Sequence, residues 1–107
     1  MNLHQVVASL IEAQNSFDSQ AYADCFTETA IVHDEGKTHK GKAEIQQWIE
    51  NSNREYQAVL KPLRYEETGA ERLLIGEVSG TFPGSPAILK FHLRLEADLI
   101  QSLTITG

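Results

Sequence analysis

The first half of the chain carries apolar residues at helical spacing. They recur at the i, i+3, i+4, i+7 and i+8 positions of a single helical face: Leu3, Val6, Val7, Leu10 and Ile11. Asn2 and Gln5 stand three residues apart, which is the spacing of a capping pair. The pattern predicts a first helix that begins almost at the amino terminus and runs to about Gln14.

Two further helical patterns follow. After a polar break around Phe17, a short helix takes its apolar side from Tyr22, Cys25 and Phe26. A third helix is expected after Gly41, where the apolar stripe consists of Ile45, Trp48 and Ile49. A stripe of this kind is typical of a helix that packs against the core.

From Glu55 onward the apolar period changes from helical to alternating. In residues 87–96 four apolar side chains alternate with a mainly polar set: Leu89, Phe91, Leu93 and Leu95 against Ile88, Lys90, His92 and Arg94. Turn residues separate four strand candidates, which span residues 55–67, 71–82, 87–96 and 99–106. Pro62 predicts an edge strand or a bulge in the first of them.

Early helices and late strands indicate the fold class. A hairpin around Gly36 adds two strands between the second and third helices, so the expected order is ααββαββββ. This order predicts an α+β domain in which the helices cover one face of a curved sheet. At 107 residues the chain is sufficient for one core, and we expect a single domain over residues 1–107.

Composition excludes several classes of function. The formal net charge of −6 opposes a phosphate backbone and the nine basic residues form no cluster, so we expect no nucleic-acid partner. The chain has no long apolar run and no basic leader, which predicts a cytoplasmic protein outside the membrane. The single cysteine, Cys25, has no partner for an internal disulfide and is expected in the core.

The candidate chemistry is concentrated in residues 30–41, A-I-V-H-D-E-G-K-T-H-K-G. Alternation places Asp34 on one face of the strand and His33 on the other. A two-residue loop, Glu35-Gly36, would put His39 on the face of Asp34 and form an Asp-His pair. A three-residue loop would put His39 on the face of His33 instead, and glycine at the third loop position suits that alternative.

The hairpin leaves two other interpretations open. In the three-residue register, His33 and His39 with Glu35 would approximate two histidines and one carboxylate, a set that binds metals. The polar residues can also be the solvated end of an ordinary hairpin. We predict neither a metal nor a cofactor, and we expect His4 and His92 to be structural or interfacial.

Several motifs resemble the nuclear transport factor 2-like superfamily, whose members include ketosteroid isomerase, scytalone dehydratase and the SnoaL-like polyketide cyclases. The matching motifs are C-F-T-E-T-A-I-V-H-D and H-K-G-K-A-E-I, together with the aromatic in Y-A-D-C-F and the helix A-E-I-Q-Q-W-I. V-S-G-T-F-P-G-S-P is similar to a segment of small SnoaL-like bacterial proteins. The resemblance implies a cystatin-like α+β roll, in which three helices cover the concave face of a cone-shaped, curved antiparallel sheet.

The resemblance also implies a site inside the cone. Asp34 matches the position of the general base in ketosteroid isomerase, and burial in an apolar cavity would raise its pKa. We predict Asp34 and His39 as catalytic residues. We predict four aromatic side chains as substrate-binding walls: Tyr22, Trp48, Phe82 and Phe91.

This chain departs from ketosteroid isomerase at the two positions that stabilise the oxyanion. The tyrosine of the first helix is matched by Leu10, and the protonated aspartate of a later strand is matched at or near Phe91. Such donors contribute on the order of several kcal/mol, so steroid isomerase activity itself is not expected. Tyr22, Tyr56 and Tyr65 are the tyrosines able to supply a hydroxyl instead.

The sequence therefore supports two hypotheses. In the first, the protein binds or acts on a small hydrophobic molecule by proton transfer beside a carbonyl, as an isomerase, dehydratase or cyclase. In the second, the same fold serves as a non-catalytic ligand-binding or dimerisation module, which the short chain and the small cavity it allows would favour. The resemblance also implies a homodimer that packs through the outer face of the sheet.

Overall fold

A computed structural model describes all residues, 1–107, and contains the nine elements expected from the sequence in the expected order. The helices are α1 (Gln5–Asn15), α2 (Ser19–Ala23) and α3 (Lys42–Tyr56). The strands are β1 (Phe26–Asp34), β2 (Lys37–Lys40), β3 (Val59–Thr68), β4 (Glu71–Ser79), β5 (Ala87–Glu96) and β6 (Leu99–Thr106). The α+β prediction is therefore confirmed.

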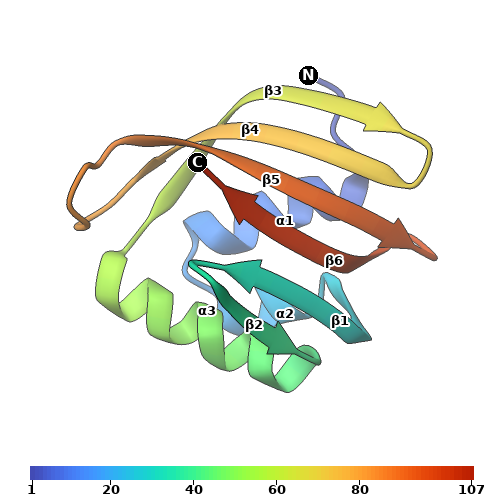
Figure 1. Ribbon diagram of the computed structural model, residues 1–107, viewed down its shortest axis with the longest axis horizontal. Coiled ribbons are helices and arrows are strands. Elements are labelled where there is room, and N and C mark those ends of the chain that lie inside the picture. The colour runs from blue at the N-terminus through green and yellow to red at the C-terminus, as the bar shows by residue number, and fades with distance from the viewer.

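One six-stranded sheet forms the molecule's main layer, with the strand order β2-β1-β6-β5-β4-β3. Figure 1 shows this curved sheet with the three helices gathered on one of its faces. The pairing is antiparallel except between β1 and β6, which run parallel. The curved antiparallel sheet that the resemblance implied is present, and β1 and β6 are its one parallel pair.

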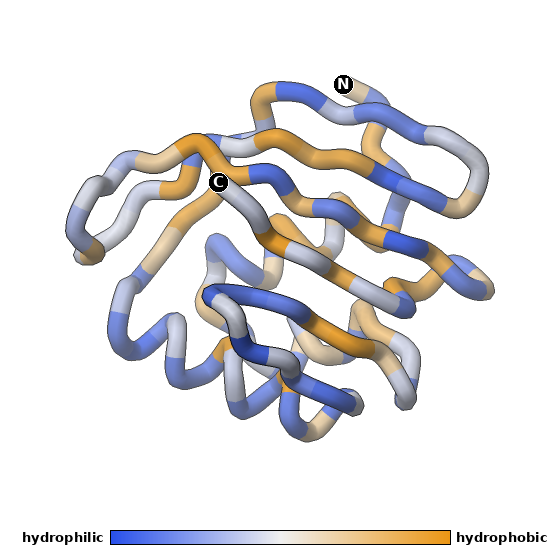
Figure 2. The backbone as a smooth tube through the Cα atoms, viewed as in Figure 1, coloured by the Kyte–Doolittle hydropathy of each residue, from blue (hydrophilic) through white to orange (hydrophobic).

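The core lies between the concave face of the sheet and the helices. Nineteen buried side chains form one cluster, and its largest fully buried members include Phe26, Ile45, Leu74, Leu93, Ile100 and Leu103. Figure 2 shows β5 alternating between hydrophobic and hydrophilic residues, as the sequence pattern predicts. In β5, Phe91 and Leu93 are buried, while His92 and Arg94 are exposed on the outer face.

The start of α1 and the end of α2 differ from the prediction. His4 caps α1 through its side chain, which accepts a hydrogen bond from the Val6 N–H at 3.1 Å, so the predicted Asn2 and Gln5 capping pair was wrong. Asp18 caps α2, and this helix ends at Ala23. Cys25 and Phe26 were predicted in that helix but lie after it.

The long strands also begin and end differently from the pattern. We expected β3 to begin at Glu55, but α3 continues to Tyr56. Gln57 caps the end of this helix in the left-handed conformation, with a φ of 49°. We expected β4 to reach Phe82, but it stops at Ser79, and the Thr81 N–H then donates to the Tyr56 carbonyl. Pro62 lies in an edge strand and at a register shift, which confirms both readings of that proline.

Two contacts fix the helical layer to the edge of the sheet. The Asn15 side chain at the end of α1 donates to the Leu60 carbonyl at 3.0 Å and accepts from the Leu60 N–H at 2.7 Å. The Gln14 amide donates to the Ala58 carbonyl at 2.8 Å. These bonds satisfy backbone groups of Leu60 in β3 and of Ala58 just before it. They therefore hold the end of α1 against β3, the strand at one edge of the sheet. None of the helices is long and apolar enough to span a membrane.

Candidate functional site

The β1–β2 hairpin has the two-residue loop, Glu35-Gly36. Asp34 pairs with Lys37 and Val32 pairs with His39 in the register. Both loop residues have positive φ, 53° at Glu35 and 74° at Gly36, which is the requirement of the turn that matches strand twist in a tight hairpin. The sequence left two registers open, and the protein adopts the one that places His39 and Asp34 on the same face of the sheet.

This register separates the two histidines of the hairpin. His33 lies on the outer face, where its Nδ1 is 3.1 Å from the Thr38 hydroxyl oxygen. His39 lies on the opposite face, where its ring stacks on Trp48 with the ring centroids 5.4 Å apart. The set of His33, His39 and Glu35 required the other register, so that metal-site interpretation was wrong.

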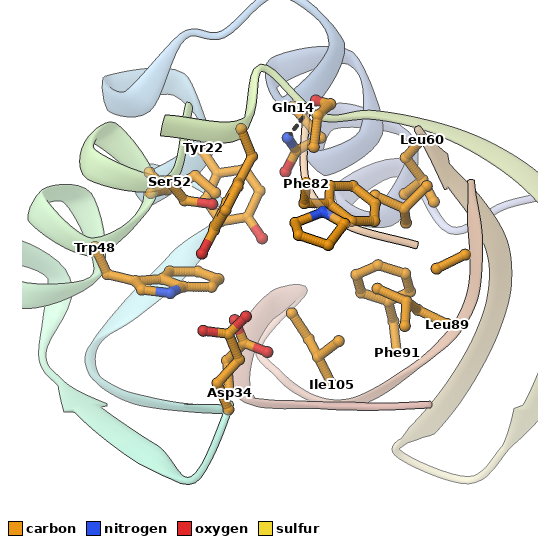
Figure 3. Close-up of a pocket in the computed structure, with 17 residues that line it drawn as sticks. Gln14, Tyr22, Asp34, Trp48, Ser52, Leu60, Phe82, Leu89, Phe91 and Ile105 are labelled. Carbon is orange, nitrogen blue, oxygen red and sulfur yellow. Dashed lines mark hydrogen bonds between the residues drawn. The ribbon is translucent and has the colours of Figure 1, made fainter. Parts of the chain in front are cut away.

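A cavity of about 530 Å³ lies between the sheet and the helices. Seventeen residues line it, and twelve of them are hydrophobic. Figure 3 shows that its two sides differ: polar and aromatic groups lie on one side, and aliphatic and phenyl groups on the other. The first set includes Tyr22, Asp34, Trp48 and Ser52; the second includes Leu60, Leu89, Phe91 and Ile105.

Five of the six predicted site residues line this cavity: Tyr22, Asp34, Trp48, Phe82 and Phe91. They come from α2, β1, α3, the loop after β4, and β5, so the fold brings together residues that are far apart in the sequence. His39 does not line the cavity and makes no hydrogen bond to Asp34. Its contact with the site runs through the Trp48 ring.

The Asp34 carboxyl group lies at the end of β1, where the strand meets the cavity. Burial and, to a lesser extent, the negative charge of the neighbouring Glu35 together raise the pKa of Asp34 to about 6. The indole N–H of Trp48 and the backbone N–H of Glu35 act in the opposite direction because they stabilise the carboxylate. A carboxyl with this pKa exchanges its proton near neutral pH, as a general base or acid requires.

Tyr22 provides the only fully buried phenol of the site. The residue is 2% exposed, and its ring packs on Phe26 and Trp48 with ring centroids 5.6 and 6.0 Å apart. Burial raises the pKa of Tyr22 far above its usual value, and the nearby Cys25 and Asp34 groups add to the rise. The phenol therefore stays protonated, and its O–H is a donor aimed into the cavity (Figure 3).

Besides Asp34 and Glu35, three residues with polar groups line the cavity; Tyr56 was named only as a tyrosine able to supply a hydroxyl, and Gln14 and Ser52 were not expected there. Ser52 and Tyr56 follow Trp48 at intervals of four residues in α3, so they lie on the same helical face. That spacing was a signal that could have found them. Gln14, the third residue, lies at the end of α1, and no local pattern indicates that its side chain reaches the cavity.

The burial of Asp34 predicts how stability depends on pH. The folded-state pKa of about 6 exceeds the value of 3.8 for an exposed aspartate, so the folded state binds the proton more tightly than the unfolded state does. The contribution of Asp34 to the free energy of unfolding therefore falls as the pH rises from about 4 to about 6, and it stays low above that window.

The variant Asp34→Asn should remove this dependence. We expect it to be more stable than the wild type by about 1–2 kcal/mol at neutral pH, a value reduced for the partial exposure of the carboxylate, and equally stable near pH 4. Chemical denaturation across that pH range measures the difference. A stability difference that is independent of pH would contradict the burial of a charged Asp34.

Comparison with solved structures places this geometry in a family. A candidate polyketide cyclase from Sinorhizobium meliloti is 31% identical to this chain, with a TM-score of 0.94 over 97% of this chain and 95% of that one. A protein of ketosteroid isomerase-like fold from Catenulispora acidiphila, solved in complex with trimethylamine, is 16% identical over 99% of this chain and 87% of that one, with a TM-score of 0.89.

The third comparison is with a computationally designed 17-OHP binder, which is 15% identical over 95% of this chain and 87% of that chain, with a TM-score of 0.80. No protein-family model matches the sequence, and no curated protein sequence matches it. The two comparisons at 16% and 15% identity show the similarity of the fold alone.

Fold and cavity together define an α+β roll that encloses an apolar cavity with a carboxylate at its edge. The chain belongs to the nuclear transport factor 2-like superfamily, which includes the SnoaL-like polyketide cyclases. The family expected from the sequence motifs is therefore confirmed. The curved sheet with three helices on its concave face, which the resemblance implied, is confirmed as well.

Proposed function

We propose that this protein binds a small hydrophobic molecule in the cavity and transfers a proton beside a carbonyl group of that molecule, with Asp34 as the base. The observation that carries the proposal is the position of Asp34, a half-buried carboxyl of pKa about 6 that faces an apolar cavity. Isomerisation, dehydration and cyclisation all begin with such a proton transfer, and none of them requires a cofactor.

The size and lining of the cavity support a ligand of this kind. Small-molecule sites have volumes of roughly 300–1,000 Å³ and mostly apolar walls with a few polar groups. The cavity here, at about 530 Å³, lies within that range. The Sinorhizobium meliloti relative is described as a candidate polyketide cyclase, and a designed protein of this fold binds 17-OHP.

The remaining polar groups have roles that follow from their chemistry. At neutral pH most Asp34 carboxyls are ionised and able to accept a proton, because the pKa is about 6. The Tyr22 O–H is the buried donor available to the carbonyl oxygen as it gains negative charge. The indole N–H of Trp48 stabilises the ionised form of Asp34, and the His39 ring stacks on the indole ring.

A second candidate function is ligand binding without catalysis. Leu10 and Phe91 stand where ketosteroid isomerase has its oxyanion donors, and both are buried apolar residues here. Phe91 lines the cavity, while Leu10 packs in the core. This observation favours a binding module, since Tyr22 is then the single buried donor on which catalysis would depend.

A ligand screen tests the binding step that both functions share. We expect the midpoint of thermal unfolding to rise in the presence of a cognate ketone, steroid or aromatic polyketide, because a ligand that binds only the folded state stabilises it. At about 100 times Kd the stabilisation is about 2.7 kcal/mol. A hit is then followed by NMR in D₂O, where loss of the proton beside the carbonyl reports the transfer. A screen in which no compound of these classes raises the midpoint would overturn the proposal.

We also propose a cytoplasmic homodimer that packs through the outer face of the sheet. Apolar side chains on that face support it, since they occupy the strand positions that alternate with the buried ones: Ile31, Leu73, Ile75 and Ile88. Ile88 is 51% exposed in the single chain. A reducing compartment suits the one free cysteine, Cys25, which is buried.

A further inference from the structure

The charge of the cavity has one sign. Two carboxylates line it, those of Asp34 and Glu35, and none of the seventeen lining residues is lysine, arginine or histidine. Lys37 pairs with Asp34 in the hairpin register but neither lines the cavity nor forms an ion pair with that carboxylate. His39 lies behind the Trp48 ring. An anionic ligand would therefore meet uncompensated repulsion, whereas a cation would be attracted.

Aromatic faces surround the same side of the cavity. Tyr22 and Trp48 form an edge-to-face pair with their ring centroids 6.0 Å apart, and both lie on the side of the cavity next to Asp34 in Figure 3. Tyr56 and Phe82 form a second edge-to-face pair at 6.1 Å among the lining residues. An ammonium group gains energy from aromatic ring faces as well as from carboxylates, and the gain is larger in a site shielded from water.

The Tyr22 hydroxyl makes no hydrogen bond within the protein. Tyr22 is 2% exposed, and no hydrogen bond contributes to the shift of its pKa. Its hydroxyl oxygen points into the cavity, where it can accept a hydrogen bond from a ligand N–H. An unpaired hydroxyl at the cavity surface is available to a polar atom of a ligand at that place.

From these observations we propose that the ligand is an amphipathic amine, whose ammonium group binds between Asp34, Tyr22 and Trp48 while its apolar body lies against Leu89 and Phe91. This inference rests on the proposed ligand-binding function of the cavity and specifies the chemical class of the ligand. This binding mode suits the function of ligand binding without catalysis, because the ammonium group takes the place beside Asp34 and Tyr22 that a reacting carbonyl group would need. Glu35 at the edge of the cavity adds attraction at long range.

A bound ammonium group would offset the repulsion between the two adjacent carboxylates of the cavity. Asp34 and Glu35 are adjacent, and the charge of Glu35 raises the cost of ionising Asp34, which is an unfavourable arrangement in the free protein. A cation between Asp34 and the aromatic rings relieves that repulsion and restores the ionised form. Binding of an amine is therefore coupled to release of a proton from the fraction of Asp34 that is protonated.

Three probes with one apolar body and three charges test the proposal. They are 1-adamantylmethylamine, 1-adamantanemethanol and 1-adamantanecarboxylate, and isothermal titration at neutral pH measures the affinity of the intact protein for each. We expect the amine to bind about tenfold or more tightly than the alcohol, and the carboxylate to bind more weakly than the alcohol. The preference for the amine should weaken as salt is added.

Matched variants locate the effect. Asp34→Asn should reduce the affinity for the amine about tenfold or more and leave the affinity for the alcohol nearly unchanged. Glu35→Gln should have a smaller effect in the same direction. Glu50→Gln is the control, since Glu50 is an exposed residue of α3 outside the cavity and the substitution makes the same change in net charge.

The outcomes separate this inference from the proposed function. If the alcohol and 2-adamantanone bind but the amine binds no more tightly, the amine proposal is overturned and the hydrophobic-ligand proposal stands. If the amine binds preferentially but Asp34→Asn and Glu50→Gln have equal effects, the preference is one of overall charge and the proposal fails. If none of the four compounds binds, both proposals fail.

Discussion

Replacing Asp34 with asparagine should slow proton transfer from a bound ketone by on the order of 10²–10⁴-fold, because a positioned general base contributes about that factor. The amide has nearly the shape of the carboxylate but cannot accept a proton at neutral pH. The measurement is the rate of deuterium incorporation beside the carbonyl, followed by NMR with a compound that the thermal screen identifies. The pH profile should add a second signature, since the wild-type rate should rise as the pH passes about 6 and the carboxyl ionises.

The control for this experiment is Glu50→Gln, which should leave both the rate and its pH profile unchanged. Binding of the ketone to Asp34→Asn is measured alongside, so that a lost rate is not confused with lost affinity. If the variant binds the ketone and retains the wild-type rate, Asp34 is not the base. If neither protein exchanges the proton although both bind, the binding module is the function that remains.

Replacing Phe26 with alanine should have the largest effect on stability. The side chain is 1% exposed, and it lies where the chain enters β1 from the helical layer. Its ring packs on Tyr22 at 5.6 Å, and its backbone pairs with Ile100 in the parallel register of β1 and β6. Since removal of a buried phenyl ring costs about 3–5 kcal/mol, the variant should lose much of the 5–15 kcal/mol typical of a small domain.

Phe17→Ala is the matched control because Phe17 is 45% exposed and lies in the turn between α1 and α2. Its loss should change the free energy of unfolding by no more than about 0.5 kcal/mol. Urea denaturation of both variants gives the comparison. Equal losses for the two phenylalanines would show that Phe26 does not anchor the entrance of β1, and a conservative Phe26→Leu variant should recover part of the stability if it does.

The candidate site was predictable where a residue's direction follows from local geometry. Alternation along the first strand predicted that Asp34 and His33 lie on different faces of the sheet, and the structure has them on different faces. The spacing of Trp48 within α3 placed it on the inner face of its helix, and it lines the cavity. The family resemblance then added the reason to choose Asp34, since no local pattern distinguishes it from other strand-end carboxylates.

Prediction failed where the outcome depends on what a segment packs against. The hairpin register was undecided because glycine at residue 36 suits loops of either length, and packing of His39 on Trp48 accompanies the register that the protein adopts. The reach of Gln14 into the cavity was missed for the same reason, since its position relative to β3 depends on how α1 lies across the sheet.

The sequence by itself determined the α+β class, the order of the elements, the alternation of faces along the long strands, and the family. These properties follow from local periodicity and from short motifs, whose physical basis is the geometry of a few consecutive residues. Only the tertiary structure decided that β1 pairs in parallel with β6, that the hairpin has a two-residue loop, and that the cavity is acidic without a basic neighbour. Each of these depends on contacts between segments that are distant in the chain, or on the choice between two locally acceptable conformations, and the packed core selects among them.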